Sequence, residues 1–228
     1  MPKKKNPTIS ICMATMNEAE SISKVIKEFK GVLGAYPLEF VITDSSTDGT
    51  PKIAESLGAR VIRQKPSGYG VALKESLLAA RGDIIITTDC DCTYPASAAP
   101  EMIRLINEGY DVVSASRLKG GVRNMKPLNE AGNRMFSALV SLLYGCTCTD
   151  ATSGMRAFRR HVIRSIEWTE NTGLSLELFF KPAAAGYRIA EVPIEYRERI
   201  GVVKLNPFTG GFDMMKTIIK CRFMRPRK

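Results

Sequence analysis

The sequence predicts an α/β protein whose mostly parallel sheet is covered by helices on both faces. Two observations lead to this prediction. Short apolar runs alternate with segments of helical periodicity, which is the pattern of β-α-β units. The runs are apolar on consecutive residues, as strands buried on both faces require. With 228 residues, 44% of them hydrophobic and 25% charged, the chain has the composition of a soluble globular protein with a sizeable core.

Six segments have the composition of strands. Each is a short run rich in Val, Ile, Phe or Thr, and turn or helix signals separate it from the next run. The predicted strands cover residues 8–13, 39–43, 60–63, 83–88, 111–116 and 188–196.

Helices are predicted between these strands. Asn17 and Glu20 have the spacing of a capping box, and an apolar stripe follows from Ile22 to Leu33. Thr50-Pro51 is a helix-start signal, with Pro at the first helical position. Further helices are predicted over residues 71–80, 98–108, 129–145, 173–186 and in the final segment, 206–228.

Polar motifs follow several of the predicted strands. The first strand is followed by MNE, the second by TDSSTDGT, the fourth by TTDCDCTYP and the fifth by SASRL. Ligands of parallel α/β sheets bind beyond the carboxyl ends of the strands, so we expect these motifs to meet at one edge. The sequence therefore predicts a single site there.

In TTDCDCTYP, Asp89 and Asp91 alternate with Cys90 and Cys92. Two carboxylates at i and i+2 suit a hard divalent cation, which in turn binds a diphosphate. The cysteines then face the other way as small apolar side chains. The plainer alternative is that the two aspartates cap the next helix and that Asp44 is a turn former.

The charge distribution indicates an anionic partner. The net charge is +10, and residues 199–228 contain eight Lys or Arg against one acid, Asp213. The six cysteines form no CxxC pair and no zinc spacing with His161, so disulfides are not expected and a reducing cytoplasm is predicted. No apolar stretch approaches the roughly 20 residues of a membrane span.

Taken in order, ATMNEAESI, VITDSSTDGT, TTDCDCTYP, SASRL, DATSGMRAF and EVPIEYRERIGVVKL resemble glycosyltransferase family 2 enzymes of the dolichyl-phosphate mannose synthase type, especially archaeal dolichyl-phosphate hexosyltransferases. The resemblance covers residues 8–205. It implies a GT-A (nucleotide-diphospho-sugar transferase) fold over residues 1–205, followed by a basic amphipathic helix over residues 206–228.

The implied reaction is transfer of a hexose from a GDP- or UDP-sugar to dolichyl phosphate, with Mg²⁺ or Mn²⁺ and inversion of configuration. The lipid-linked product would serve protein glycosylation. The final helix would lie in the membrane interface, so the resemblance and the charge together predict a peripheral or monotopic protein on the cytoplasmic face of the cell membrane. Packing of this helix against the domain is the alternative.

The resemblance also assigns residues on the donor side. Glu18 and Asp44 match residues that face the nucleotide, Glu18 toward ribose and base and Asp44 toward the base. Asp89 and Asp91 match the DxD metal ligands, of which Asp91 is the stronger. The family's usual aromatic residue before Asn17 is replaced by Met16, so the identity of the donor stays open.

On the acceptor side the matched residues are basic. Arg117 matches an arginine that meets the acceptor phosphate, and Arg199 and Lys204 match residues that close over diphosphate and acceptor. A phosphate acceptor is already an anionic nucleophile, so these cations, together with Asp91, are the predicted catalytic residues.

Three other functions remain as alternatives. A glycosyltransferase acting on a saccharide hydroxyl would need a positioned general base. A sugar-phosphate nucleotidyltransferase would need a glycine-rich, basic N-terminal loop, and SICMATMNEAE is acidic there. A nucleic-acid-binding module is suggested by charge alone, without a recognised motif, so nucleic acid is not an expected partner.

Overall fold

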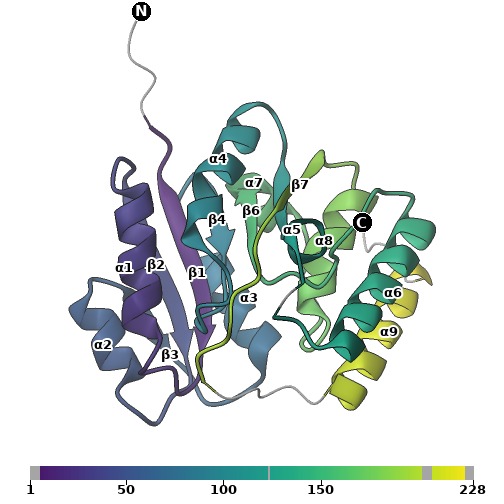
Figure 1. Ribbon diagram of the computed structural model, residues 1–228. Coiled ribbons are helices and arrows are strands. Elements are labelled where there is room, and N and C mark those ends of the chain that lie inside the picture. Colours follow the sequence, from purple (N-terminus) through teal and green to yellow (C-terminus); the bar gives the residue numbers. More distant parts are fainter. Residues whose placement is uncertain (1–5, 123, 202–206, 224–228) are drawn as a thin grey trace, which may run out of the picture.

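One sheet in the order β3-β2-β1-β4-β6-β5-β7 organises the residues that the computed structural model describes, 6–122, 124–201 and 207–223 (Figure 1). The strands are β1 (Ile9–Thr15), β2 (Leu38–Asp44), β3 (Arg60–Arg63), β4 (Ile84–Thr87), β5 (Val112–Ser116), β6 (Arg156–Arg159) and β7 (Ile189–Pro193).

Most of the strand pairs are parallel, as the sequence predicts. β1 pairs in parallel with β2 and β4, β2 with β3, and β5 with β7. β6 is antiparallel to both β4 and β5. The sequence analysis missed β6 because its four residues, RAFR, include two arginines and resemble a surface loop. The parallel strands bring the carboxyl ends of β1, β2 and β4 to one edge.

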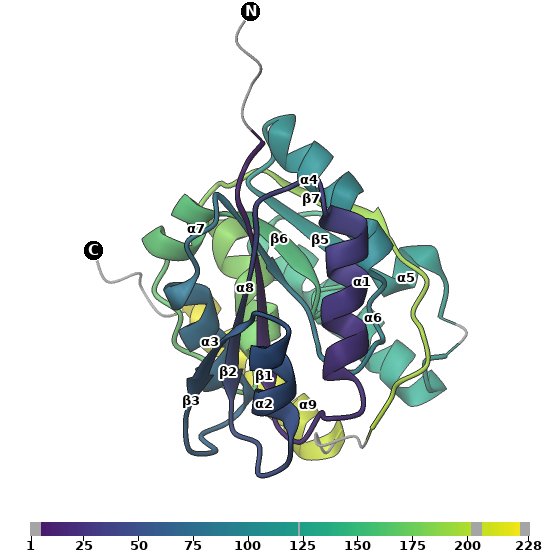
Figure 2. The same cartoon turned by 90° about the vertical axis from the view of Figure 1, so that its left-hand side faces the viewer.

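Helices cover both faces of the sheet. Figure 2 shows α1 and α4 on one side of the strands and α3 and α7 on the other. The helices are α1 (Ile22–Leu33), α2 (Thr50–Ser56), α3 (Tyr69–Ala79), a 3-10 turn (Ala96–Ala98), α4 (Ala99–Asn107), α5 (Arg117–Gly120), α6 (Pro127–Tyr144), α7 (Arg160–Ser165), α8 (Leu174–Ala184) and α9 (Pro207–Phe223).

Apolar side chains form a core on each face of the sheet. On one face, the stripe of α1, including Ile26 and Phe29, packs against β1 and against α4. On the other, Leu73 and Leu77 of α3 pack with Phe158 of β6. Burying one such side chain contributes about 1.5–3 kcal/mol. These two layers hold the sheet, and with it the carboxyl-end loops, in place.

A third apolar cluster joins α6, α8 and α9. Phe136 and Val140 of α6, Phe179 and Phe180 of α8 and Ile218 of α9 are buried in it. The C-terminal helix therefore packs on the domain, as one of the two predicted arrangements requires. Within the part of the chain that the structure describes, no helix is both long enough and apolar enough to cross a membrane.

The start of α1 differs from the predicted capping box. The helix begins at Ile22, its N-cap is Ser21, and no side chain caps it. Asn17 has a φ of 54° in the left-handed region, and its Oδ1 accepts a hydrogen bond from Thr47 N at 2.9 Å. Asn17 thus links the loops after β1 and β2 and does not cap α1. Asn tolerates this conformation because its short amide can bond the nearby backbone.

Candidate active site

Asp91 is held in a fixed position just beyond β4. Its side chain is only 3% exposed. One carboxylate oxygen, Oδ1, accepts hydrogen bonds from Thr93 N at 3.0 Å and Thr93 Oγ1 at 2.6 Å. The other, Oδ2, lies 2.6 Å from Arg199 Nη2. Asp91 and Arg199, each predicted as a catalytic residue, are therefore brought together, although 108 positions separate them in the sequence.

The surroundings of Asp89 disfavour the negative charge of its carboxylate. Burial and the negative charge of Asp91 raise the pKa of Asp89 to about 6, and a hydrogen bond from Tyr69 and the charges of Arg199 and Arg117 offset part of this rise. Tyr69 OH donates to Asp89 Oδ1 at 3.0 Å. Two close carboxylates, one with a raised pKa, mark a place where a further positive charge would be favourable.

This donor set fits a hard divalent cation. Carboxylate oxygens are the ligands that Mg²⁺ and Mn²⁺ prefer. No group of three potential metal-ligating side chains (His, Cys, Asp or Glu) occurs in the described ranges. A cation held by Asp89 and Asp91 would thus keep positions for non-protein oxygens, which is how Mg²⁺ is usually bound to substrate phosphates.

Gly154 leaves room for the Asp89 carboxylate. A Cβ at this position would lie 2.7 Å from Asp89 Oδ2, closer than the two atoms can approach. We expect Gly154→Ala to displace Asp89 and to weaken Mn²⁺-dependent nucleotide binding about tenfold or more, since metal sites tolerate little displacement of their ligands. Isothermal titration with Mn²⁺ and a nucleoside diphosphate measures this. Gly31→Ala, where a Cβ meets nothing within 4 Å, is the matched control and should bind as the unmodified chain does.

The segment that follows β7, residues 194–201, closes over the DxD loop. It is the yellow-green trace that descends from β7 in front of the sheet in Figure 1. Its backbone pairs with the loop, because Arg197 N donates to Thr93 O at 3.1 Å and Ile200 N to Asp91 O at 2.9 Å. An ion pair between Arg197 and Glu28 of α1, at 2.9 Å, fixes it further. These bonds place Arg199 next to Asp91.

Glu18 borders the same segment from the other side. Its backbone N donates to Thr50 Oγ1 at 2.8 Å, and its Oε2 accepts from Ser21 Oγ at 3.3 Å. A Cβ on Gly201 would lie 3.6 Å from Glu18 Oε2, so Glu18 is next to the end of the segment that carries Arg199. That Glu18 contacts the nucleotide stays a prediction.

Asp44 is fully buried at the end of β2. Oδ1 accepts from Thr15 Oγ1 at 2.7 Å and Ser46 Oγ at 2.5 Å, and Oδ2 accepts from Ser46 N at 3.1 Å and forms an ion pair with Arg63. Asp44 thus orders the loop after β2 as a turn former would. A contact with the nucleotide base in addition to these bonds stays a prediction.

Arg117 is buried, and other residues of the protein bind its guanidinium. Its Nε and Nη2 each lie 2.7 Å from the carboxylate of Asp150, and Nη2 also donates to Thr152 Oγ1 at 2.8 Å. Burial alone would raise the pKa of Asp150, but Arg117 holds it below the usual value. The guanidinium also lies over the Tyr196 ring. Arg117 is therefore a rigid cation, and its contact with an acceptor phosphate stays a prediction. Lys204 lies outside the described residues.

The two cysteines of the motif are packing residues, as expected. Cys90 is buried in the core cluster of α1 and α4, and Cys92 packs against the same cluster. Burial raises the pKa of both thiols. Cys92 has a φ of 65°, in the left-handed region, so the loop beyond β4 does not continue the extended strand on which the predicted alternation of side chains was based.

Sequence reasoning missed two residues at this site, Tyr69 and Asp150. Tyr69 is the first residue of α3 and reaches Asp89 over a separation of 20 positions. Asp150 holds Arg117 over 33 positions. An available signal for Asp150 was the DATSGMRAF motif that begins with it. For Tyr69 the signal was the glycine on each side, which brings the chain close to Asn171.

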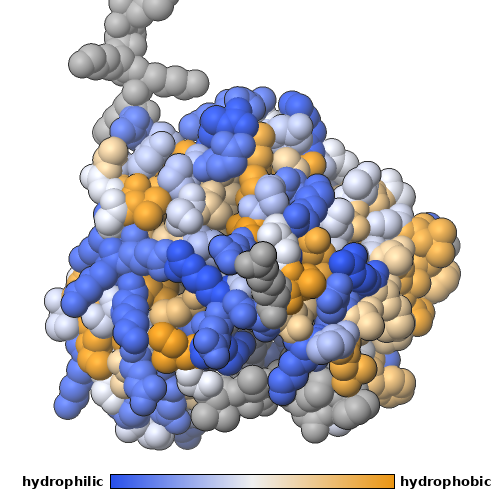
Figure 3. All heavy atoms as spheres, in the orientation of Figure 1, coloured by the Kyte–Doolittle hydropathy of each residue, from blue (hydrophilic) through white to orange (hydrophobic). Residues whose placement is uncertain are grey.

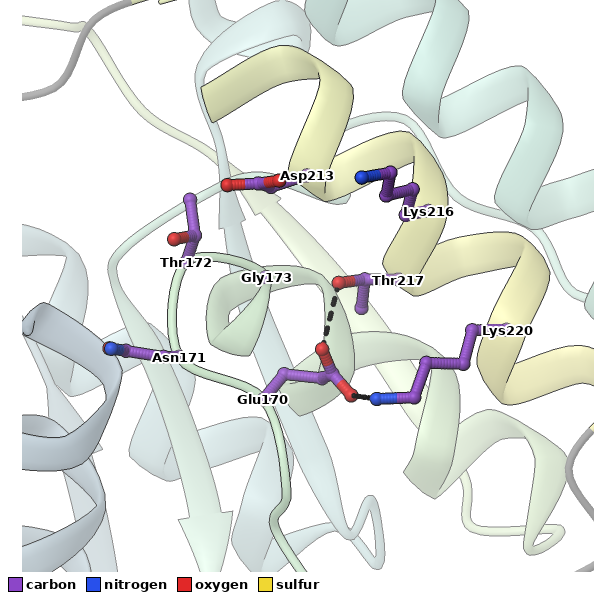
Figure 4. A pocket seen from close by; sticks show the side chains of 8 residues that line it. All are labelled: Glu170, Asn171, Thr172, Gly173, Asp213, Lys216, Thr217 and Lys220. Carbon is purple, nitrogen blue, oxygen red and sulfur yellow. Dashed lines mark hydrogen bonds and ion pairs between the residues drawn. The ribbon is translucent and has the colours of Figure 1, made fainter. Parts of the chain in front are cut away.

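A hollow of about 280 Å³ lies away from the two carboxylates, between the loop at residues 170–173 and α9 (Figure 4). Glu170 spans it, accepting from Lys220 Nζ at 2.9 Å and from Thr217 Oγ1 at 3.1 Å. Neither Asp89 nor Asp91 lines it. We place the candidate site at the carboxylates and not at this hollow. The raised pKa of Asp89 and the loops that converge from several strands are both found at the carboxylates.

Comparisons with known proteins place the chain in a family. Residues 10–167 match the model of glycosyl transferase family 2. A dolichyl-phosphate hexose transferase of Haloferax volcanii is 50% identical over 212 residues, which are 93% of this chain and 92% of the relative. A low-salt glycan biosynthesis hexosyltransferase of the same organism is 36% identical over 93% of this chain, which spans about half (53%) of that relative.

A solved structure shows the same fold. It is glucosyl-3-phosphoglycerate synthase from Mycobacterium tuberculosis, in complex with Mn²⁺, uridine diphosphate and glucosyl-3-phosphoglycerate. It aligns with a TM-score of 0.75 and 24% identity over 97% of this chain and 82% of that one. The predicted GT-A fold is confirmed. By its family match, its close relative and its architecture, the chain belongs to glycosyltransferase family 2.

Proposed function

We propose that this glycosyltransferase transfers a hexose from GDP-mannose or a UDP-sugar to dolichyl phosphate, with inversion, and so makes a lipid-linked sugar for protein glycosylation. The observation that carries the proposal is the Asp89–Asp91 pair with Arg199 on Asp91. Such a cluster can stabilise the negative charge of a nucleoside diphosphate leaving group. The acceptor is supported by the relative that is 50% identical and named a dolichyl-phosphate hexose transferase.

The proposed donor-side roles follow from position. Asp89 and Asp91 would hold Mg²⁺ or Mn²⁺, and such a cation would supply Lewis-acid stabilisation of negative charge on the diphosphate. Arg199, about a third exposed, is close enough to pair with a diphosphate oxygen next to Asp91. Glu18, on the loop after β1, and Asp44, the last residue of β2, orient the nucleoside. The glucosyl-3-phosphoglycerate synthase structure that contains Mn²⁺ and uridine diphosphate supports this choice of metal.

The proposed acceptor-side roles belong to Arg117 and Lys204. They bring the anionic acceptor toward the sugar, so that the phosphate oxygen attacks the anomeric carbon directly and no general base is required. The surroundings of α8 favour a phosphate acceptor over a saccharide hydroxyl, which would need a general base. The only carboxylate of that helix, Glu177, is buried and accepts from Thr169 N at 2.9 Å while pairing with Lys181. It is already committed to these partners.

We further propose that the protein works at the cytoplasmic face of the membrane, as a peripheral or monotopic protein. A dolichyl chain stays in the bilayer, so the enzyme must reach its phosphate at the surface. The basic sequence of residues 206–228 supports such a position.

A donor panel tests the proposed reaction. The purified full chain, with Mn²⁺ or Mg²⁺ and a short-chain dolichyl phosphate, is incubated with GDP- and UDP-sugars while nucleoside diphosphate and glycolipid are measured together. A glycolipid formed from one donor, and lost on chelation of the metal, is the expected result. Release of diphosphate without a lipid product would favour the saccharide acceptor, and no turnover of any donor would contradict the proposal.

A further inference from the structure

The two carboxylates of the candidate metal site are fixed unequally. Asp91 accepts two hydrogen bonds from Thr93 and pairs with Arg199. Among the residues that the structure describes, the one hydrogen-bond donor to the Asp89 carboxylate is Tyr69 OH, which lies 3.0 Å from Oδ1. The orientation of Asp89 therefore depends on where Tyr69 lies.

The backbone around Tyr69 is held from another part of the chain. Tyr69 is the first residue of α3, and its N-cap, Gly68, has no side chain that could cap the helix. Asn171, in the loop before α8, takes this role. Its Oδ1 accepts from Gly70 N at 2.9 Å, and its Nδ2 donates to Ser67 O at 3.0 Å. Since one amide group carries both an acceptor and donors, Asn171 bonds the chain on both sides of Tyr69.

The glycines that flank Tyr69 make this contact close. A Cβ on Gly68 would lie 2.1 Å from Asn171 Nδ2, and a Cβ on Gly70 would lie 2.2 Å from Asn171 O. Gly68 also has a φ of 104°, which residues with a side chain rarely adopt. The backbone before and after Tyr69 thus lies directly against Asn171.

The loop that carries Asn171 is itself held by α9. Figure 4 shows Asn171 and Glu170 pointing in opposite directions from this loop, with Glu170 directed toward α9. Glu170 accepts from Lys220 Nζ at 2.9 Å and from Thr217 Oγ1 at 3.1 Å. A Cβ on Gly173 would lie 2.3 Å from Thr217 Oγ1, so the loop also packs closely on α9. Asn171 therefore links the start of α3 to a loop with a fixed place.

Tyr69 lies at the border of the solvent, where it is 41% exposed. Figure 3 shows hydrophilic side chains gathered in front of the sheet, along the segment after β7. In such a polar surrounding a mobile phenol exchanges a carboxylate partner for water, because a hydrogen bond within the protein replaces one to water. A fixed backbone is needed to keep the Tyr69 hydroxyl on Asp89, and the bonds from Asn171 supply it.

We propose that Tyr69 is a positioning residue for Asp89 in cation binding, and that Asn171 acts through Tyr69. The phenol hydroxyl holds the carboxylate in one orientation, so less freedom is lost when Asp89 binds a divalent cation. This inference rests on the proposed function, which makes Asp89 a metal ligand. It goes further because it adds two residues, from the start of α3 and from the loop before α8, to which that function gives no role.

Tyr69→Phe tests the first part, because it removes the hydroxyl and keeps the ring. Binding of UDP or GDP, whichever the unmodified full chain binds, is measured by isothermal titration at increasing Mn²⁺ concentrations. The Mn²⁺ concentration for half-maximal binding should rise about tenfold or more, as is typical when a partner of a metal ligand is lost. Affinity for the nucleotide at saturating Mn²⁺ should stay close to that of the unmodified chain. A general loss of structure would lower both.

Tyr144→Phe is the matched control. Its hydroxyl also donates one hydrogen bond, to Ile218 O at 2.8 Å, but beside the third apolar cluster and away from the carboxylates. This variant should need no more Mn²⁺ than the unmodified chain, and both Phe variants should keep a Tm within a few degrees of it. An unchanged Mn²⁺ requirement in Tyr69→Phe would overturn the proposal.

A double-variant cycle tests the link to Asn171. Asn171→Ala alone should raise the Mn²⁺ requirement, whereas Thr172→Ala, a change in the same loop, should not. In the Tyr69→Phe background Asn171→Ala should have little further effect, because a residue that acts through a hydroxyl has nothing to act on once that hydroxyl is gone. Effects that multiply in the double variant would show that Asn171 acts independently and would overturn this part of the proposal.

The outcome is separable from that of the proposed function. If the unmodified chain binds neither UDP nor GDP in a Mn²⁺-dependent way, or if Asp91→Asn binds them equally well, the metal site is wrong and this inference falls with it. If Asp91→Asn loses Mn²⁺-dependent binding while Tyr69→Phe keeps it unchanged, the metal site stands and the positioning role of Tyr69 is excluded.

Discussion

Replacing Asp91 with Asn is expected to reduce kcat/KM for sugar transfer about a thousandfold or more, which corresponds to about 4 kcal/mol of transition-state stabilisation. The neutral amide is a poor ligand for a hard cation, and the anion that anchors Arg199 is lost as well. Initial rates of nucleoside diphosphate release, with the donor found in the panel, measure the effect.

Thermal unfolding and nucleotide binding accompany this measurement. The Tm of Asp91→Asn should stay within a few degrees, because Arg199 is partly exposed and exposed ion pairs contribute little. Mn²⁺-dependent binding of a nucleoside diphosphate should disappear. Thr93→Val, which removes one hydrogen bond to Asp91 and keeps the carboxylate, is the matched control and should retain most of the activity. An Asp91→Asn variant with a tenth of normal activity would exclude Asp91 as the main metal ligand.

Replacing Arg117 with Met is expected to lower the free energy of unfolding by about 3–5 kcal/mol, because the buried carboxylate of Asp150 would lose its cation. For a chain of this size the Tm falls by about 6–20 °C. Scanning calorimetry of the purified variant measures it.

The double variant Arg117→Met/Asp150→Asn separates structure from catalysis. Removing both charges should recover part of the stability, since the carboxylate of Asp150 is no longer left without Arg117, but only part, because the buried Arg156 loses the nearby charge of Asp150. If Arg117 also meets the acceptor phosphate, the double variant stays poorly active even when folded, and the loss appears in kcat/KM for the acceptor. A folded double variant with normal acceptor kinetics would make Arg117 a purely structural residue.

The sheet and the edge at which the candidate site lies were predictable from the sequence because both depend on local patterns. Apolar runs alternating with helical stripes fix the parallel strands, and parallel strands bring Asp44 and Asp89 to one edge. β6 was not predictable in this way. Its two arginines contradict the usual composition of a strand, yet Arg156 is fully buried and its strand joins the two halves of the sheet.

The partners of the site residues depend on tertiary contacts that local patterns do not contain. Nothing near Arg117 in the sequence indicates that its guanidinium will form an ion pair with Asp150. The same holds for α6. An apolar stretch such as MFSALVSLLYG predicts a buried helix, and only the packing against α8 and α9 shows which of its residues remain outside, Leu142 among them.

The segment that covers Asp91 has a practical consequence for shortened versions of the protein. The match to the family model ends at residue 167, but the backbone bonds from Arg197 and Ile200 to the DxD loop come from beyond that point. A fragment trimmed to the matched stretch would lack β7, α8 and Arg199 and would leave Asp91 open to water. A fragment made for nucleotide-binding or crystallisation work must therefore extend at least through Gly201.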